Sequence, residues 1–211
     1  MSQATAPPGP GTGTGRRSAR ATRTREAVVD ALLTLIDEGN LRPTAREIAA
    51  RAGVSLRSVY VHFDDVEDLF GAAAQRHFEN LEPIIRQQLC DDDAPFHERV
   101  EAFVERRALI YESNANIGRA AALQEPFSPA MRRILDGARR FSRAQIDAVF
   151  SPELSSRDSP RGEWQRSGLE VVVGTEAWDV LRRRQRLSVD EAKDVMRGLV
   201  RAIIAGPETD S

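Results

Sequence analysis

The residues best suited to do chemistry in this chain lie in one stretch, TAREIAARAGVSLRSVYVHF, residues 44 to 63. Thr44 and Glu47 are a capping-box pair that begins one helix, and Gly53 suits the left-handed turn that ends it. Ser55 then caps a second helix, which keeps its Leu, Arg, Ser and Tyr side chains off the core. A protein places a helix in the major groove of DNA with this geometry, so the stretch predicts non-covalent recognition of DNA.

The sequence contains no comparable pattern for catalysis or for metal binding. The sequence contains no nucleophile elbow, no phosphate-cradling glycine loop and no paired acidic motif in a cleft-like context. His77 and His97 lack metal-ligand spacing, and Cys90, the single cysteine, has no neighbouring histidine. One cysteine excludes an internal disulfide and suits a reducing cytoplasm, and no apolar run approaches the roughly 18 residues that cross a bilayer. We therefore expect a cytoplasmic protein that is not an enzyme and uses no cofactor or metal.

The charge is distributed unevenly along the chain. The net charge is −2, which argues against general coating of nucleic acid. Residues 1–25 nevertheless carry five arginines and no acidic residue, whereas residues 64–101 are rich in aspartate and glutamate. A cationic N-terminal end and an acidic middle fit a molecule that docks one end on a polyanion.

The rest of the pattern is helical. Residues 1–21 predict a disordered, arginine-containing arm, and 206–211 a disordered tail. Residues 22–68 predict a three-helix head, and 69–205 a larger helical domain that begins with a helix capped by Asp64 and Glu67. Five helices are expected after Asp91–Pro95, at about 96–112, 115–124, 128–150, 161–185 and 188–205. The sequence therefore predicts an all-α fold of about nine helices, in which the head carries the helix-turn-helix.

These features resemble the TetR family of bacterial transcription regulators. The motif match covers about residues 24–70, and the stretch WDVLRRRQRLSVDEAKDV resembles C-terminal segments of the family less specifically. The resemblance implies a homodimeric repressor that a small hydrophobic effector releases from a palindromic operator, with the larger domain binding the effector and forming the dimer. A ligand-dependent activator or corepressor-type regulator shares the same head. A small all-α enzyme with an incidental helix-turn-helix is a further alternative, but no titratable cluster supports it.

Carried onto this chain, the resemblance predicts which residues contact DNA. Thr44 would bind phosphate, and Tyr60 and His62 would hold the phosphate backbone. Arg57 is the candidate for direct readout, because a guanidinium matches guanine O6 and N7. The full predicted set is Arg23, Arg25, Thr44, Ser55, Leu56, Arg57, Ser58, Tyr60 and His62. Plainer interpretations remain: Tyr60 as a core-edge residue, His62 as a helix C-cap and the arm as a solvated tail.

One departure from the family concerns the start of the fourth helix. The family often has a phosphate-gripping lysine where this chain has Val66, flanked by Asp64, Asp65, Glu67 and Asp68. We expect the arginine-rich arm to compensate by reaching the minor groove.

Apolar stripes predict a dimer interface and an effector cavity. The segment 161–185 has two apolar faces, which predicts a neighbour beyond its own bundle, and Gly174 suits a close helix crossing. The predicted interface is Val171, Gly174, Trp178, Val195, Leu199 and Ile203; the alternative is that these stripes are monomer core. The predicted effector contacts are Phe103, Arg107, Ile110, Tyr111, Asn114, Phe127, Met131, Phe141 and Trp164. An inward-pointing Arg107 would favour an anionic or carbonyl-bearing effector.

Overall fold

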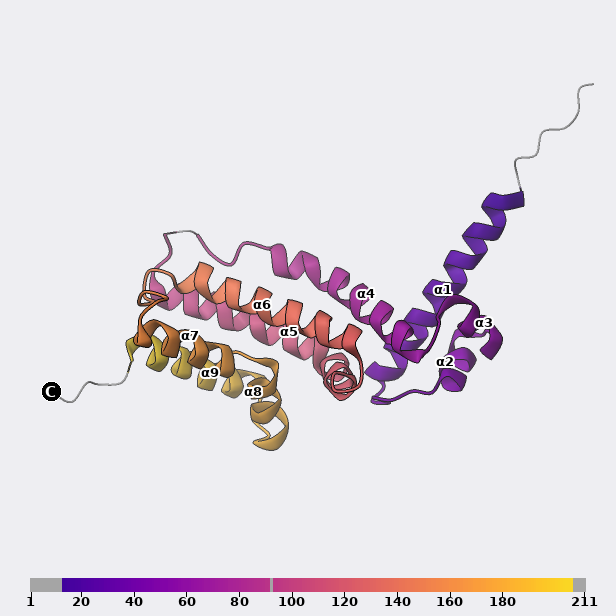
Figure 1. Cartoon of the computed structure of the whole chain (residues 1–211). Coiled ribbons are helices and arrows are strands. Elements are labelled where there is room, and N and C mark those ends of the chain that lie inside the picture. Colours follow the sequence, from indigo (N-terminus) through magenta and orange to yellow (C-terminus); the bar gives the residue numbers. More distant parts are fainter. Residues whose placement is uncertain (1–12, 92, 207–211) are drawn as a thin grey trace, which may run out of the picture. The chain divides into compact units, whose positions relative to one another are not determined.

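The computed structural model describes residues 13–91 and 93–206, and for residues 13–17 it describes the helical backbone alone. Throughout this part of the chain the regular structure is helical, with nine α-helices and one short π-helical segment (Figure 1). The chain divides into two compact units, Met1–Ala73 and Ala74–Ser211. The boundary falls five residues beyond the expected one, because Leu69, Phe70 and Ala73 are buried in the first turns of α4 (Val66–Arg86). The all-α prediction is confirmed.

The first unit is a three-helix head with α4 beginning at its end. It contains α1 (Gly13–Asp37), α2 (Ala45–Ala52) and α3 (Leu56–His62), and α1 packs against both of the short helices. Its core includes Val28, Leu32, Ile36, Ile48, Val59 and Phe63.

Local capping interactions form the head as the sequence predicts. Glu47 N–H donates to Thr44 Oγ1, and Thr44 N–H donates to the Glu47 carboxylate at 2.7 Å, so the capping box is present. Gly53 follows α2 at φ 66°, in the left-handed region that glycine adopts without strain. Ser55 Oγ accepts from Ser58 N–H at 3.1 Å and thereby starts α3.

Two expectations for this region were wrong. Residues 13–21 are helical rather than disordered, since α1 starts at Gly13. Arginine and alanine are good helix formers, and the Thr22 hydroxyl donates to the carbonyl of Ser18, one turn back. The cap of α4 also lies one residue later than expected, because Asp65 accepts from Asp68 N–H at 2.8 Å. The predicted disordered segments 1–12 and 207–211 lie outside the described residues.

The second unit is a helical bundle. It contains the end of α4, then α5 (Phe96–Gln124), α6 (Pro129–Phe150), α7 (Pro160–Val172), α8 (Thr175–Asp179), the π-helical η1 (Val180–Arg184) and α9 (Val189–Ala205). Figure 1 shows α5 beside α6 and α7 beside α9, and α5 also packs against α9. The core between these helices includes Phe103, Phe150, Leu169, Met196 and Val200.

The helix boundaries differ from the predicted ones at two places. The predicted helices 96–112 and 115–124 are one helix, α5, in which the Ser113 hydroxyl donates back to the Ile110 carbonyl instead of breaking the turn. The predicted single helix 161–185 is broken, because α7 ends at Val172 and Gly174 is the extended N-cap residue of α8. Gly174 therefore marks a break between helices, not a close crossing in the middle of one.

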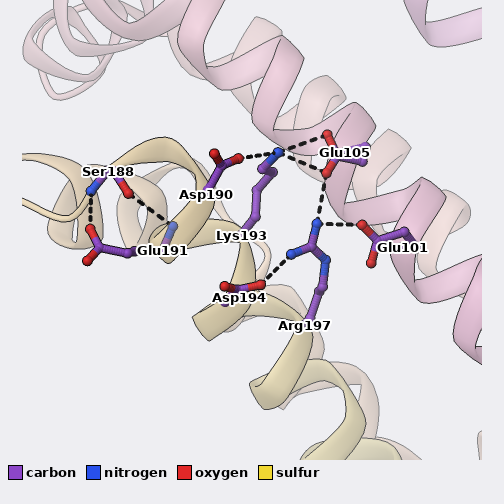
Figure 2. A network of polar contacts seen from close by, with 8 residues as sticks. All are labelled: Glu101, Glu105, Ser188, Asp190, Glu191, Lys193, Asp194 and Arg197. Atoms are coloured by element: carbon purple, nitrogen blue, oxygen red, sulfur yellow. Dashed lines mark hydrogen bonds and ion pairs between the residues drawn. The ribbon is translucent and has the colours of Figure 1, made fainter.

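An ion-pair network joins α5 to α9 (Figure 2). Arg197 pairs with Glu101 at 2.5 Å and with Glu105 at 2.8 Å, both on α5. Lys193, the single lysine of the chain, reaches Glu105 at 2.9 Å and Asp190 at 2.8 Å. Because both cations are mostly covered and share Glu105, the network holds the two helices in one register more effectively than isolated surface pairs would.

Candidate nucleic-acid interface and ligand cavity

The second helix of the helix-turn-helix, α3, presents the predicted recognition side chains to solvent. Leu56 is 39% exposed and Tyr60 50% exposed, while Val59, on the opposite face, is buried. Arg57 is exposed, and no ion pair or hydrogen bond to its side chain occurs among the described residues. Its guanidinium therefore remains available for a bidentate contact with a base.

The polar side chains around Arg57 already form hydrogen bonds within the head. Ser55 and Ser58 are hydrogen-bonded to each other at 2.9 Å between their hydroxyl oxygens. The Thr44 hydroxyl donates to Glu47 at 2.6 Å, and this contact, with the backbone N–H of Thr44, lowers the pKa of the Glu47 carboxyl. A phosphate that approaches Thr44 would meet the charge of Glu47, so its expected phosphate contact through the backbone N–H and hydroxyl stays a prediction.

The remaining predicted DNA contacts lie on α1 and at the end of α3. Arg23 is exposed, whereas the Arg25 guanidinium lies over the Phe63 ring, 4.9 Å from its centroid. His62 is half-buried in the last turn of α3. Val61 is 69% exposed beside Tyr60, a position that the sequence did not single out, because a lone valine in a short helix carries no periodic signal.

A cavity of about 240 Å³ lies wholly within the second unit. Five of the nine predicted effector contacts line it: Arg107, Ile110, Tyr111, Asn114 and Phe141. The first four follow one face of α5 at three- and four-residue steps, which is why the sequence pattern found them.

Four predicted effector contacts do not line this cavity. Phe103 and Met131 are each 2% exposed and belong to the packed interior; the Phe103 ring meets Phe150 edge-on at 5.2 Å. Phe127, in the α5–α6 connection, is 74% exposed, and Trp164 on α7 is 46% exposed. Composition alone could not separate these residues, because aromatic side chains suit core, surface contact and cavity alike.

Several lining residues were missed by the sequence reasoning. They come mainly from the last turns of α4 and from α6, and include His77, Phe78, Leu81, Ile85, Leu135, Ala138 and Gln145. The α4 residues recur at steps of one, three and four, a helical stripe that could have indicated a second wall. Two ion pairs also involve lining residues: Arg139 pairs with Glu125 at 2.6 Å, and Glu170 pairs at 2.7 Å with Arg143, which itself does not line the cavity.

The predicted interface residues divide into exposed and buried groups. Val171 is 70% exposed, Leu199 41% and Val195 38%, while Ile203 and Gly174 are half-buried. Trp178 is 3% exposed and does not belong to an outer face. Its Nε1–H donates to Glu112 at 2.9 Å, because the break at Gly174 turns α8 and with it the indole into the bundle.

Together the fold and the exposed α3 define an all-α transcription regulator that binds DNA through an N-terminal helix-turn-helix. Residues 28–73 match the family described as bacterial regulatory proteins, tetR family. The HTH-type transcriptional activator FasR of Mycolicibacterium smegmatis is 31% identical over 188 residues, covering 84% of this chain and 78% of FasR. The chain belongs to the TetR family of transcription regulators.

Solved structures support the same fold. A transcriptional regulator from Rhodococcus sp. Rha1 aligns with a TM-score of 0.65 at 18% identity, covering 90% of this chain and 99% of its own. A tetR-family regulator from Streptomyces coelicolor aligns at 0.64 and 18% identity, covering 90% and 92%. The multidrug binding protein EbrR, solved with imidazole, aligns at 0.58 and 19% identity, covering 89% and 95%. Within the described residues, no helix has the length and apolar character that a membrane span requires.

Proposed function

We propose that the chain is a homodimeric repressor that binds a palindromic operator and leaves it when a small, largely apolar effector fills the cavity. The observation that carries the DNA-binding part is the exposed α3, on which Arg57 has no partner among the described residues. A two-fold dimer presents two such helices to successive major-groove faces, roughly 34–36 Å apart, and this geometry requires a palindromic site.

The exposed apolar residues of α7 and α9 support the dimer. Val171, Val195 and Leu199 lie on elements that pack against each other within one chain, and each side chain is more than a third exposed. A second copy would remove this apolar surface from water, which favours association. The V171D/L199D double variant should therefore be monomeric, whereas L109D, which changes an equally apolar exposed residue on α5, should remain a dimer.

The cavity and α4 together support effector control. His77, Phe78, Leu81 and Ile85 of α4 line the cavity, and the same helix begins in the first unit. A ligand in the cavity therefore contacts the helix whose first turns belong to the head. It would act by favouring the state of the dimer whose recognition helices do not match the operator.

Activation of transcription is the specific alternative to repression. The 31%-identical relative is named a transcriptional activator, which favours an activating regulator as the second candidate. Both candidates bind a palindrome, so they differ only in the effect on transcription from a promoter that carries the operator.

Selection of the purified protein on random double-stranded DNA tests the proposal. An enriched palindrome supports the dimeric DNA-binding function, and loss of enrichment with V171D/L199D links it to the proposed interface. Transcription in vitro from a promoter that overlaps the selected site then separates repression from activation. Weak binding without any enriched sequence would contradict the proposal.

A further inference from the structure

Arg107 is the one charged side chain that is buried within the described part of the chain, with 6% of its surface exposed. It lies on α5 and lines the cavity of the second unit. Its hydrogen bonds are long, 3.4 Å to the Tyr111 hydroxyl and 3.5 Å to the Ser142 carbonyl, and its guanidinium lies 4.8 Å from the centre of the Phe103 ring. No carboxylate of the described residues forms an ion pair with it.

A buried cation without an anion is costly for a folded protein. Removal of a charge from water costs several kcal/mol unless a counter-charge and good hydrogen bonds replace the water. The contacts of Arg107 supply neither fully, because two long bonds leave most of its five N–H donors unused. An anion that entered the cavity would supply both and would be bound for that reason.

The carboxylates of the cavity wall and its second arginine, Arg139, are matched or solvated. Glu125 pairs with Arg139 at 2.6 Å, and Glu170 pairs with Arg143 at 2.7 Å. Glu176 is exposed at the start of α8, and it interacts electrostatically with Arg139. One buried positive charge therefore remains unmatched, which suits a single negative charge. A dianionic phosphate would bring a second negative charge, for which the wall offers no further unpaired arginine.

The rest of the wall determines the other part of the ligand. Apolar side chains from α4, α5 and α6 cover most of it: Phe78, Leu81, Ile85, Ile110, Leu135 and Phe141. Asn114, two turns beyond Arg107 on α5, has a buried side-chain oxygen without a hydrogen-bond partner, a second sign that the cavity suits a ligand with polar groups. At about 240 Å³ the cavity lies just below the usual range of roughly 300–1,000 Å³ for ligand sites, so the ligand is small.

From these observations we infer that the cavity binds a small amphipathic carboxylate. Its acid group pairs with Arg107, and its apolar part lies against α4 and α6. This inference rests on the proposed function, in which a cavity ligand controls DNA binding, and adds to it the chemical class of that ligand.

Calorimetric titration of the full chain with sodium octanoate, octan-1-ol and octyl phosphate tests the inference. Octanoate should bind at least about tenfold more tightly than octan-1-ol, because an ion pair between the guanidinium and a carboxylate is stronger than a hydrogen bond from the guanidinium to an uncharged hydroxyl. The R107Q variant should lose this preference, and R107K should retain part of it. The matched control R140Q changes an exposed arginine of α6 that does not line the cavity and should bind as the wild type does.

Thermal unfolding without ligand shows whether the R107Q variant is folded. Because R107Q removes an unmatched buried charge, its melting temperature should equal or exceed that of the wild type. A lower melting temperature with an unchanged preference for the acid would assign Arg107 a structural role and overturn the inference. Equal binding of octanoate and octan-1-ol, tighter binding of octyl phosphate, or no binding of octanoate to the folded wild type would also overturn it.

Operator binding, measured in parallel, keeps the two proposals separate. If no operator is selected, the proposed regulator function is wrong. The preference of the cavity for an acid is still tested by the titrations, which do not depend on DNA. If the operator is bound and octanoate binds through Arg107 without changing operator affinity, the ligand class holds and the effector role fails.

Discussion

Replacement of Arg57 by alanine should weaken operator binding and relax sequence preference at one base pair of each half-site. Arg57 is exposed on α3 and forms no ion pair within the described chain, so its removal breaks no contact of the free protein. A bidentate guanidinium–guanine contact contributes about 1–3 kcal/mol. For two half-sites the loss is about 2–6 kcal/mol, or roughly thirtyfold or more in Kd.

Fluorescence anisotropy provides the measurement, with the selected operator and variants substituted at each base pair in turn. The wild type should discriminate at the position read by Arg57, whereas R57A should bind all four bases there with similar affinity. The matched control is R51A. Arg51 belongs to the same head but is tied to Glu38 at 2.6 Å, so this variant should leave operator affinity and specificity unchanged.

A uniform loss of affinity in R57A, with the base preferences intact, would refute the assignment. Arg57 would then bind phosphate, and the slope of log K against log salt concentration would fall by about one for each phosphate interaction that the variant lacks. A preserved slope with altered specificity is the result expected of direct readout.

Three further predictions concern other parts of the molecule. Deletion of residues 1–19 should weaken operator binding and flatten its salt dependence, because it removes Arg16 and Arg17. An unchanged slope of log K against log salt concentration would exclude a DNA contact by this segment. Trp178→Phe should lower the free energy of unfolding by about 1.5–3 kcal/mol, because it removes the hydrogen bond to Glu112. Self-association should not weaken. The same change at the exposed Trp164 should leave the free energy of unfolding unaltered. Hydrogen bonds from Arg182 and Trp178 lower the pKa of Glu112, so its stabilising effect is present above its unfolded pKa of about 4.3 and is lost as the pH falls through the lower folded value. In Glu112→Gln, the free energy of unfolding should therefore fall less steeply as the pH is lowered. A fall as steep as that of the wild type would argue against this stabilising role of Glu112.

Features that depend on neighbouring residues could be predicted from the sequence alone. The capping box at Thr44 and the left-handed Gly53 are present as expected. Each involves residues within one turn of each other, so the residue types themselves specify the geometry. The recognition face of α3 followed from the same local pattern, since Val59 faces inward and Arg57 and Tyr60 face outward.

The ends of the long helices were less predictable. Ser113 and Asn114 suggested a break, yet α5 continues through them because its buried face continues on both sides. Gly174 suggested a crossing and instead ends one helix and begins another. Both outcomes depend on packing against helices distant in sequence, and the intrinsic preferences of these residues, roughly 1 kcal/mol or less, are too small to oppose it.

The sequence by itself determined the all-α fold, the helix-turn-helix and the family, because these rest on local capping and on the periodicity of apolar residues. Only the tertiary structure decided which side chains share a cavity, that Trp178 is buried and that Arg107 is enclosed without a counter-charge. These properties depend on contacts among α4, α5, α6 and α8, which are far apart along the chain. Helical periodicity identifies the buried face of each helix, but it does not specify which other helix that face meets.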